Sequence, residues 1–317
     1  MTEKELRIEH IKVQQLPAFA ERVIRTAQPG QFVPISMQRA VAHAQNPYAD
    51  PDDVGLLVAI DEDDEVVGYF GIMPMLLRVG DTHHKTHWFT TWSVSSKVRG
   101  RGVGSMLMKE ALTLNLDFLI VGSVHARRVC QRYGFWERDP LKYYWLQPSG
   151  MGNLNPLTAV LRLARKTAHL LKLDREIAIT NAGTRWLERT LSPLTKPIFY
   201  PLLTAKLAPL FKEFNYREVP QIGEQWVEIK NRPHVELHRG PQAVNWMLNY
   251  PWIVENGQSQ TEDLDYYFSD ARPLYRLVAL EVTDPKDGTY LGFVVFSISQ
   301  KASGIALKTL DFCFGDP

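Results

Sequence analysis

Residues 93–114 read SVSSKVRGRGVGSMLMKEALTL, and they carry the most specific signal in the chain. The stretch begins as the end of a strand, packs two arginines and three glycines into positions 99–104, and continues with a helical apolar period. The first N–H groups of a helix have no partner inside it, and with the helix dipole they favour an anion. Glycine lets the backbone turn tightly there. The stretch therefore predicts a phosphate site where a strand passes into a helix.

Neither of the two common phosphate-binding loops fits this corner. A Walker loop would end in Gly-Lys-Ser/Thr, and that ending is absent. A G-x-G-x-x-G dinucleotide loop starting at Gly100 would need a third glycine five residues later, where a serine stands. What remains is Arg-x-x-Gly-x-Gly, formed by Arg99, Gly102 and Gly104. Together with Arg101, Arg99 adds charge that suits a pyrophosphate.

Strand and helix signals alternate on both sides of the corner. Apolar periodicity, β-branched runs and glycine or proline stops predict the order helix, hairpin, long strand, corner, helix, strand, helix, strand. The predicted helices are residues 16–27, 103–114 and 126–133, and the predicted strands are residues 54–61, 65–79, 83–94, 117–124 and 141–148.

These signals resemble the GNAT superfamily of N-acyltransferases. The acyl-CoA signature of that family has an aliphatic residue near a strand end, matched by Val94, followed by Arg/Gln-x-x-Gly-x-Gly/Ala at the start of a helix. ARRVCQRYGF, residues 126–135, is similar to the second signature, in which a helix ends in Gly-Phe. The resemblance covers roughly residues 5–147. It implies an α/β fold with a mixed, mostly antiparallel central sheet flanked by helices.

The resemblance implies acetyl-CoA or another acyl-CoA as co-substrate, and no metal. Backbone N–H groups from Arg101 to Ser105 would bind the CoA pyrophosphate, and the strand edge near Trp92 to Val94 would hydrogen-bond the pantetheine arm and polarise the thioester carbonyl. An amine would attack that carbonyl directly, and CoA thiolate would leave. The implied cofactor-binding residues are Trp92, Val94, Arg99, Gly100, Arg101, Gly102, Val103, Gly104 and Ser105.

The residues for proton transfer depart from the family pattern. In many relatives a tyrosine four residues before the glycine of Gly-Phe acts as general acid, and here Cys130 stands there, either as an acid or as packing. Tyr133, next to that glycine, is the second candidate. Relatives often have a carboxylate on the strand before the corner. Here His87 is the titratable residue suited to proton transfer, and Thr91 and Ser93 could instead order a water.

Two other groups of residues invite a functional reading. His83 and His87 share a strand face but lie roughly 13 Å apart at about 3.3 Å per residue, so no metal site is predicted. The segment 42–55 stands where family members usually place acceptor-binding loops. Its carboxylates could attract a cationic amine, although turn chemistry is the favoured explanation for them. They are Asp50, Asp52 and Asp53.

Composition narrows the class of protein. The chain has 36 Lys and Arg against 35 Asp and Glu, and a net charge of +1 argues against a dedicated nucleic-acid binder. Its two cysteines form no CxxC or CxxH pair, which favours a reducing compartment. The first ten residues are charged, and no run of about 18 apolar residues occurs. These features predict a cytoplasmic protein.

A length of 317 residues favours more than one domain. We predict a GNAT-like acyl-CoA-binding domain at 1–150, a helical connector at 151–215 and a smaller α+β domain at 216–317. The connector is basic, and its helix at 157–173 is expected to pack between domains rather than on a membrane. The pattern of 277–299 parallels 57–77, which fits either a partial GNAT-like repeat or an ordinary hairpin.

The predicted protein is an enzyme, an acyl-CoA-dependent N-acetyltransferase. It would move an acetyl or other short acyl group from acyl-CoA to a primary amine of a small molecule. Amino sugars are a loose analogy at the level of fold, and amino acids, peptides and polyamines stay open. The alternative is a non-catalytic acyl-CoA-binding or regulatory protein of the same fold. A third reading makes the C-terminal domain an interaction or membrane-docking module. The sequence gives no oligomeric state.

Overall fold

The computed structural model of the chain describes residues 6–137, 209, 212–223, 235–301 and 304–315. Contacts divide the chain into two units, of which the first combines Met1–Trp136 with Tyr216–Pro317 and the second is Glu137–Asn215. The first unit contains nearly all of the described residues. The strand predicted at 141–148 and the basic helix predicted at 157–173 lie outside the described residues.

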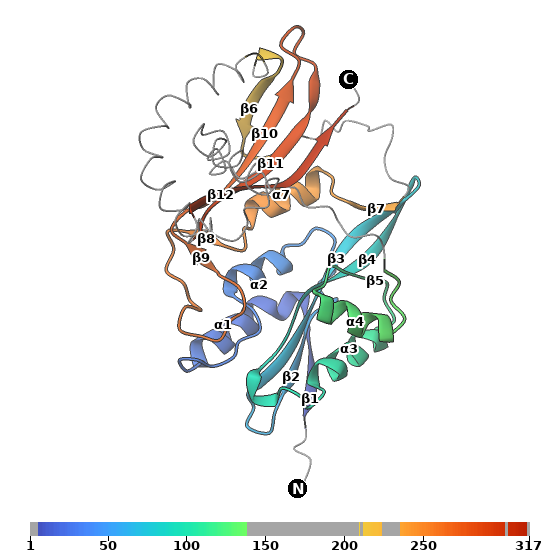
Figure 1. Cartoon of the computed structure of the whole chain (residues 1–317), viewed down its shortest axis with the longest axis vertical. Coiled ribbons are helices and arrows are strands. Elements are labelled where there is room, and N and C mark those ends of the chain that lie inside the picture. The colour runs from blue at the N-terminus through green and yellow to red at the C-terminus, as the bar shows by residue number, and fades with distance from the viewer. Residues whose placement is uncertain (1–5, 138–208, 210–211, 224–234, 302–303, 316–317) are drawn as a thin grey trace, which may run out of the picture. The chain divides into compact units, whose positions relative to one another are not determined.

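The first unit is built on a six-stranded sheet (Figure 1). Its strand order is β1-β2-β3-β4-β5, and β7 pairs with the far part of β3. All of these pairs are antiparallel except β4 with β5. The mixed, mostly antiparallel sheet expected from the sequence is confirmed. The strands are β1 (Arg7–Lys12), β2 (Val54–Ile60), β3 (Val66–Val79), β4 (Thr82–Val94), β5 (Phe118–Ile120) and β7 (Val235–His238).

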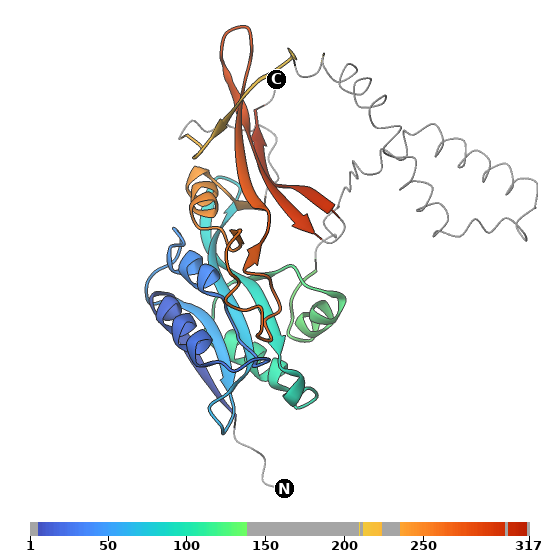
Figure 2. The same ribbon diagram turned by 90° about the vertical axis from the view of Figure 1, so that its left-hand side faces the viewer.

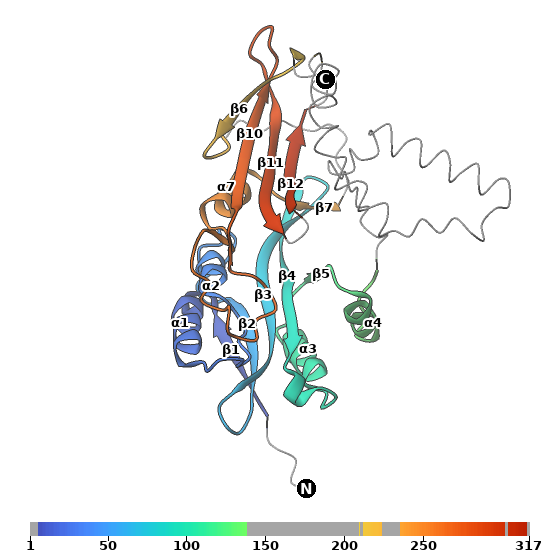
Figure 3. The ribbon, with the colours of Figure 1, turned by 60° about the vertical axis from the view of Figure 1, so that its left-hand side comes forward.

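Helices cover both faces of this sheet, as Figure 3 shows. Strand β2 explains why: Leu56 and Val58 belong to an apolar cluster on one face, and Leu57 and Ala59 to a second cluster on the other. A strand buried on both sides requires a continuous apolar run, and VGLLVAI is such a run. Helices α1 (Leu16–Thr26) and α2 (Met37–Ala44) cover the first face; α3 (Val103–Thr113) and α4 (Val124–Arg132) cover the second.

One predicted strand is shorter than expected. The prediction placed it at 117–124, but β5 ends at Ile120 and residue 124 already belongs to α4. The cause is a helix cap, because the side chain of Ser123 accepts a hydrogen bond from the backbone N–H of Ala126. Strand β1 and helix α2 are additional to the predicted elements.

The C-terminal part of the same unit forms a second sheet, whose strands run from yellow (β6) to red (β12) in Figure 2. Its order is β12-β11-β10-β6, and the hairpin expected at 277–299 is the antiparallel pair β10–β11. Helix α7 (Pro241–Asn249) packs Val244 into the cluster that contains Phe293. The remaining strands are β6 (Asn215–Val219), β8 (Val254–Glu255), β9 (Ala271–Arg272), β10 (Tyr275–Thr283), β11 (Tyr290–Lys301) and β12 (Gly304–Phe314).

Several hydrogen bonds join the C-terminal part to the N-terminal sheet and helices. Besides the β3–β7 ladder, the backbone N–H of Gly30 donates to the carbonyl of Asp263 at 2.6 Å. The indole N–H of Trp246 donates to the carbonyl of Ala42 at 2.7 Å, linking α7 to α2. The boundaries at 150 and 215 and the idea of a repeat stay predictions. None of the helices in the described ranges has the length and hydropathy needed to cross a membrane.

Candidate functional site

The corner between β4 and α3 has the geometry that its glycines predict. After β4 comes one 3-10 turn, η2 (Ser96–Val98), and then the loop that leads into α3. Gly100 and Gly102 have φ angles of +87° and +77°, in the left-handed region that favours glycine. A Cβ on either would meet nothing within 4 Å, so backbone conformation rather than space calls for glycine here. Gly102 is the N-cap residue of α3.

The first turn of α3 supplies the candidate anion donors. Residues 103–105 begin the helix, so their N–H groups have no acceptor within it. The N–H of Arg101, which the sequence placed among the donors, instead donates to the carbonyl of Val98 at 3.1 Å. The candidate donors therefore narrow to residues 102–105. The side chains of Arg99 and Arg101 are exposed beside them and make the corner positive.

Two glycines let α3 begin close to the sheet. A Cβ on Gly104 would lie 3.3 Å from the indole nitrogen of Trp92, and a Cβ on Gly68 would lie 2.9 Å from Val103. The Trp92 ring also packs edge-on against Phe70, at 5.2 Å between ring centroids. Trp92 thus fixes the first turn of α3 against β4.

Strand β4 has an open edge beside this corner. β5 pairs with it only from His87 to Phe89, so within the described residues the stretch Thr90–Val94 has no partner on that side. A register shift between Gly71 and Ile72 makes Thr90 an extra, bulged residue at the start of this stretch. An unpaired strand edge offers N–H and C=O groups to an extended chain. The predicted Trp92 and Val94 lie on this edge.

His87 lies where the pairing with β5 begins, about 10 Å along the strand from Thr90. Its side chain is 4% exposed, and neither ring nitrogen has a hydrogen-bond partner within the described part of the chain. Burial lowers the pKa of His87, with Asp53 and Lys85 acting in opposite directions. The imidazole is therefore neutral near pH 7 and able to accept a proton.

The two candidate acids differ in their surroundings. The Cys130 thiol lies in the apolar cluster between the sheet and α3, and burial raises its pKa, so it stays protonated at neutral pH. The Tyr133 side chain is partly buried, and its hydroxyl makes a long hydrogen bond, 3.5 Å, to the carbonyl of Ser105. The structure thus places Tyr133, and not Cys130, in hydrogen-bond contact with the first turn of α3.

The acidic segment before β2 is engaged in ion pairs. The Lys85 ammonium lies 2.5 Å from a carboxylate oxygen of Asp50 and 2.8 Å from one of Asp53. Asp52 pairs with Lys12 at 2.8 Å. Asp53 also accepts from the backbone N–H of Asp50, as in a turn. These carboxylates are therefore already paired with lysines.

Sequence reasoning missed a buried polar group on the opposite face of the sheet. Arg39 and His43, four residues apart on α2, are 6% and 3% exposed. Tyr69 on β3 and Tyr266 in the loop before β9 place buried hydroxyls in the same region. The i, i+4 spacing of an arginine and a histidine on an otherwise apolar helix face was the available signal.

The sequence of the N-terminal half matches a known family. Residues 22–135 fit the model of the Acetyltransferase (GNAT) family. Residues 22–135 thus form a GNAT acetyltransferase domain. Acyl transfer is thus the general chemistry of this domain, and the expected family is confirmed. Comparison with curated proteins gives no match.

Solved structures resemble the same half of the chain. They include an integron cassette protein from V. cholerae, 18% identical, covering 48% of this chain and 98% of its own, TM-score 0.29. A putative acetyl transferase from Pyrococcus furiosus is 16% identical and covers 45% of this chain and all of its own, TM-score 0.30. An aminoglycoside acetyltransferase from an uncultured soil metagenomic sample is 16% identical and covers 45% of this chain and 97% of its own, with a TM-score of 0.30.

The GNAT family uses acetyl-CoA in general, and two features of this chain fit that co-substrate. The first turn of α3 and its two arginines suit a pyrophosphate, and the open β4 edge suits an extended arm with amide groups. Among the residues that the structure describes, no group of three or more His, Cys, Asp or Glu could hold a metal ion.

Proposed function

We propose that the protein transfers an acetyl or other short acyl group from acyl-CoA to a primary amine of a small molecule. One observation carries the proposal: a positive helix N-terminus opened by two left-handed glycines lies beside Thr90–Val94. Among described residues, the edge of this stretch that faces away from β3 has no strand partner. In this proposal the corner binds pyrophosphate, and the strand edge aligns the thioester with the bulge. Positioning of this kind lowers the barrier by supplying the orientation of the reacting groups in advance.

The chain offers separate groups for the two proton transfers. We assign the amine proton to His87, reached through ordered water because His87 lies about 10 Å along the strand from the bulge. Its imidazole is neutral and lacks a partner among described residues. For the thiolate, Tyr133 is the first candidate because its hydroxyl contacts the first turn of α3. Cys130 is the second, as a buried neutral thiol.

The acceptor and the compartment are also proposals. An amino sugar remains among the proposed acceptors, with amino acids, peptides and polyamines. A cytoplasmic location is supported by the two cysteines, because Cys130 and Cys313 are both buried and neither forms a disulfide.

Calorimetric titration with acetyl-CoA tests the donor half of this proposal. The variant is Arg99→Ala with Arg101→Ala, and the matched control removes two exposed arginines from α1, Arg22→Ala with Arg25→Ala. We expect the wild type and the control to bind acetyl-CoA alike and the loop variant to bind at least tenfold more weakly. Equal binding by all three would remove the role assigned to Arg99 and Arg101, and no binding by the folded wild type would remove the acyl-CoA assignment.

Release of CoA thiol then separates transfer from binding alone. The wild type, incubated with acetyl-CoA and a panel of primary amines, should release thiol only when an amine is present. Tight acetyl-CoA binding without amine-dependent release across the panel would instead favour the non-catalytic acyl-CoA-binding protein of the same fold.

A further inference from the structure

Arg39 is a buried cation with no anionic partner among the residues that the structure describes. It lies in the first turn of α2, its side chain is 6% exposed, and its Nη1 atom has no hydrogen-bond partner within the described ranges. Burial lowers the pKa of Arg39, and the groups that oppose this are two tyrosines, Tyr266 and Tyr69, rather than a carboxylate. A buried charge normally has a counter-charge, because desolvation is costly.

The neighbours of Arg39 on α2 do not balance its positive charge. His43, one turn further along α2, has both ring nitrogens buried without partners among described residues. Burial and the nearby Arg39 lower the pKa of His43 to about 3, so it is neutral at pH 7 and supplies no negative charge. The N-terminal end of α2 is itself the positive end of the helix dipole. Arg39 and the helix dipole therefore favour an anion here, while the carboxylate of Asp265, which raises the pKa of Tyr69, acts in the other direction.

Aromatic rings contact the guanidinium without satisfying its N–H groups. The central carbon of Arg39 lies 4.3 Å from the ring centroid of Trp252 and 4.2 Å from that of Phe268. Such contacts stabilise a cation, but they offer no hydrogen-bond acceptor to its N–H donors. A carboxylate presents two oxygens in the plane of the guanidinium and would complete its hydrogen bonds.

This group lies on the face of the sheet opposite the anion corner. Tyr69, whose electrostatic contact with Arg39 is noted above, belongs to the apolar cluster with α1 and α2. It stands directly across from Ser93, which is part of the open stretch of β4. The Tyr69 and Tyr266 hydroxyls are buried and make no hydrogen bond within the described residues. An acceptor bound at Arg39 would thus approach the β4 edge from the α2 side, and acyl-CoA from the α3 side.

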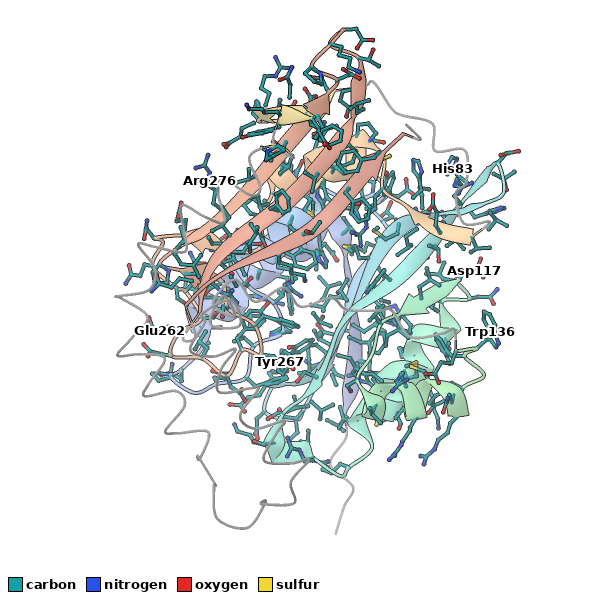
Figure 4. All side chains as sticks on the ribbon, turned by 45° about the horizontal axis from the view of Figure 1, so that its top comes forward. His83, Asp117, Trp136, Glu262, Tyr267 and Arg276 are labelled. Carbon is teal, nitrogen blue, oxygen red and sulfur yellow. The ribbon has the colours of Figure 1, made fainter. Side chains whose placement is uncertain are left out.

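We propose that the acceptor is an amine that also carries a carboxylate, and that Arg39 binds this carboxylate, with the Tyr69 and Tyr266 hydroxyls as further donors. The inference rests on the proposed acyltransferase function and specifies its acceptor. It selects amino acids and amino sugar acids over neutral amino sugars and polyamines. Trp252, Phe268 and Tyr266 all come from the C-terminal part of the chain, so that part would complete the acceptor site. Figure 4 labels Tyr267, which lies between Tyr266 and Phe268 in the sequence and so shows where their loop is.

This assignment is tested with pairs of amines in which one member carries a carboxylate and the other does not. β-Alanine is compared with β-alaninamide, and 2-amino-2-deoxyglucuronic acid with glucosamine, so the two arms separate amino acids from amino sugar acids. Thiol release at saturating acetyl-CoA gives KM and kcat for each. The variants are Arg39→Met and Arg39→Lys. The control is Arg22→Met, since Arg22 also lies over an aromatic ring, Phe19, but is exposed on α1.

We expect the wild type to favour the carboxylate member of at least one pair by tenfold or more in kcat/KM. Arg39→Met should remove that preference, mainly through KM, with unchanged acetyl-CoA affinity; Arg39→Lys should keep part of it, and Arg22→Met all of it. Equal use of both members by the wild type would overturn the inference and leave the acyltransferase proposal standing.

If the protein releases no thiol with any amine, the proposed acyltransferase function fails, and a second measurement is needed to test the carboxylate site. Thermal unfolding of the CoA-saturated protein is followed with and without glutarate, which has carboxylates but no amine. Stabilisation of the wild type and the Arg22→Met control, but not of Arg39→Met, would still support a carboxylate site at Arg39. No stabilisation of the wild type by glutarate or by either acidic amine would overturn it.

Discussion

Two glycines in this chain have nearly the same backbone conformation and different surroundings. Gly102, at the start of α3, has a φ angle of +77°, and Gly30, in the loop between α1 and α2, has a φ angle of +76°. A Cβ on either would meet nothing within 4 Å. They therefore provide a pair matched in φ and in free space for a Cβ, at two different places in the fold.

The change Gly102→Ala should weaken acetyl-CoA binding about tenfold or more, because relaxing the left-handed N-cap turns the first N–H groups of α3 away from their common focus. Both Gly102→Ala and Gly30→Ala should lower the free energy of unfolding by about 1–2 kcal/mol. Calorimetry measures the first effect and urea unfolding the second. If Gly30→Ala weakened acetyl-CoA binding equally, the loss would reflect general destabilisation and not the corner.

His43 should make stability depend on pH. Its pKa is about 3 in the folded protein and near 6.5 when unfolded, so between these values the unfolded state binds more protons. The contribution to stability is thus fully present above pH 6.5 and is lost as pH falls, by about 1.4 kcal/mol per pH unit. His43→Gln should flatten the pH dependence by that slope between pH 6 and 4.5, measured by urea unfolding. His84→Gln, at an exposed site, should leave the slope unchanged.

At the scale of elements, the bulge in β4 depends on a glycine across the sheet. A Cβ on Gly71 would lie 2.4 Å from the Thr90 hydroxyl oxygen and 2.5 Å from that of Thr91. Such contacts force a side chain or the strand itself to move. The bulge sets where the open edge of β4 begins, so Gly71 acts on the candidate site without belonging to it.

We therefore expect Gly71→Ala to lower the rate of acyl transfer by tenfold or more while changing acetyl-CoA affinity less than threefold, since the corner is untouched. Steady-state kinetics and calorimetry give the two numbers. Gly55→Ala is the control, because its Cβ would lie 2.8 Å from the Leu16 side chain, a comparable clash away from β4. A similar rate loss in Gly55→Ala would assign the effect to the core and not to the bulge.

The elements that could be predicted are those whose own residues show how they are buried or where they turn. Strand β2 is apolar throughout because both its faces are buried, and the α3 corner follows from its glycines. Strand β1 was missed because it is an edge strand with a mostly polar sequence, RIEHIK. Helix α2 was missed because its buried side includes Arg39 and His43, which breaks the apolar period.

The candidate site divides in the same way. The donor side could be predicted, because one continuous stretch, 92–105, contains it. The acceptor side could not, because Arg39 is buried by Trp252 and Phe268, more than two hundred residues away. No local pattern shows which aromatic residue of a distant loop will cover which helix. The bulge at Thr90 likewise depends on register with β3 rather than on its own sequence.

For the molecule as a whole, the C-terminal part is tied to the GNAT domain at the helix that carries Arg39. The indole N–H of Trp246 on α7 donates to the carbonyl of Ala42. This carbonyl is among the last of α2, and the last carbonyls of a helix have no N–H donor inside it. This single bond thus caps α2 from another part of the chain. The GNAT domain and the C-terminal part should accordingly lose stability together.

Trp246→Phe keeps an aromatic side chain, although a smaller one, and removes the N–H donor. It should lower the free energy of unfolding by about 1–3 kcal/mol, because a partly buried carbonyl is left unpaired. It should also raise KM for the best amine severalfold, since α2 positions Arg39, while acetyl-CoA affinity stays constant. Urea unfolding, kinetics and calorimetry measure the three. The control is Trp136→Phe, whose side chain is 83% exposed. A stability loss without any change in KM would mean that the C-terminal part supports the fold of α2 but does not shape acceptor binding.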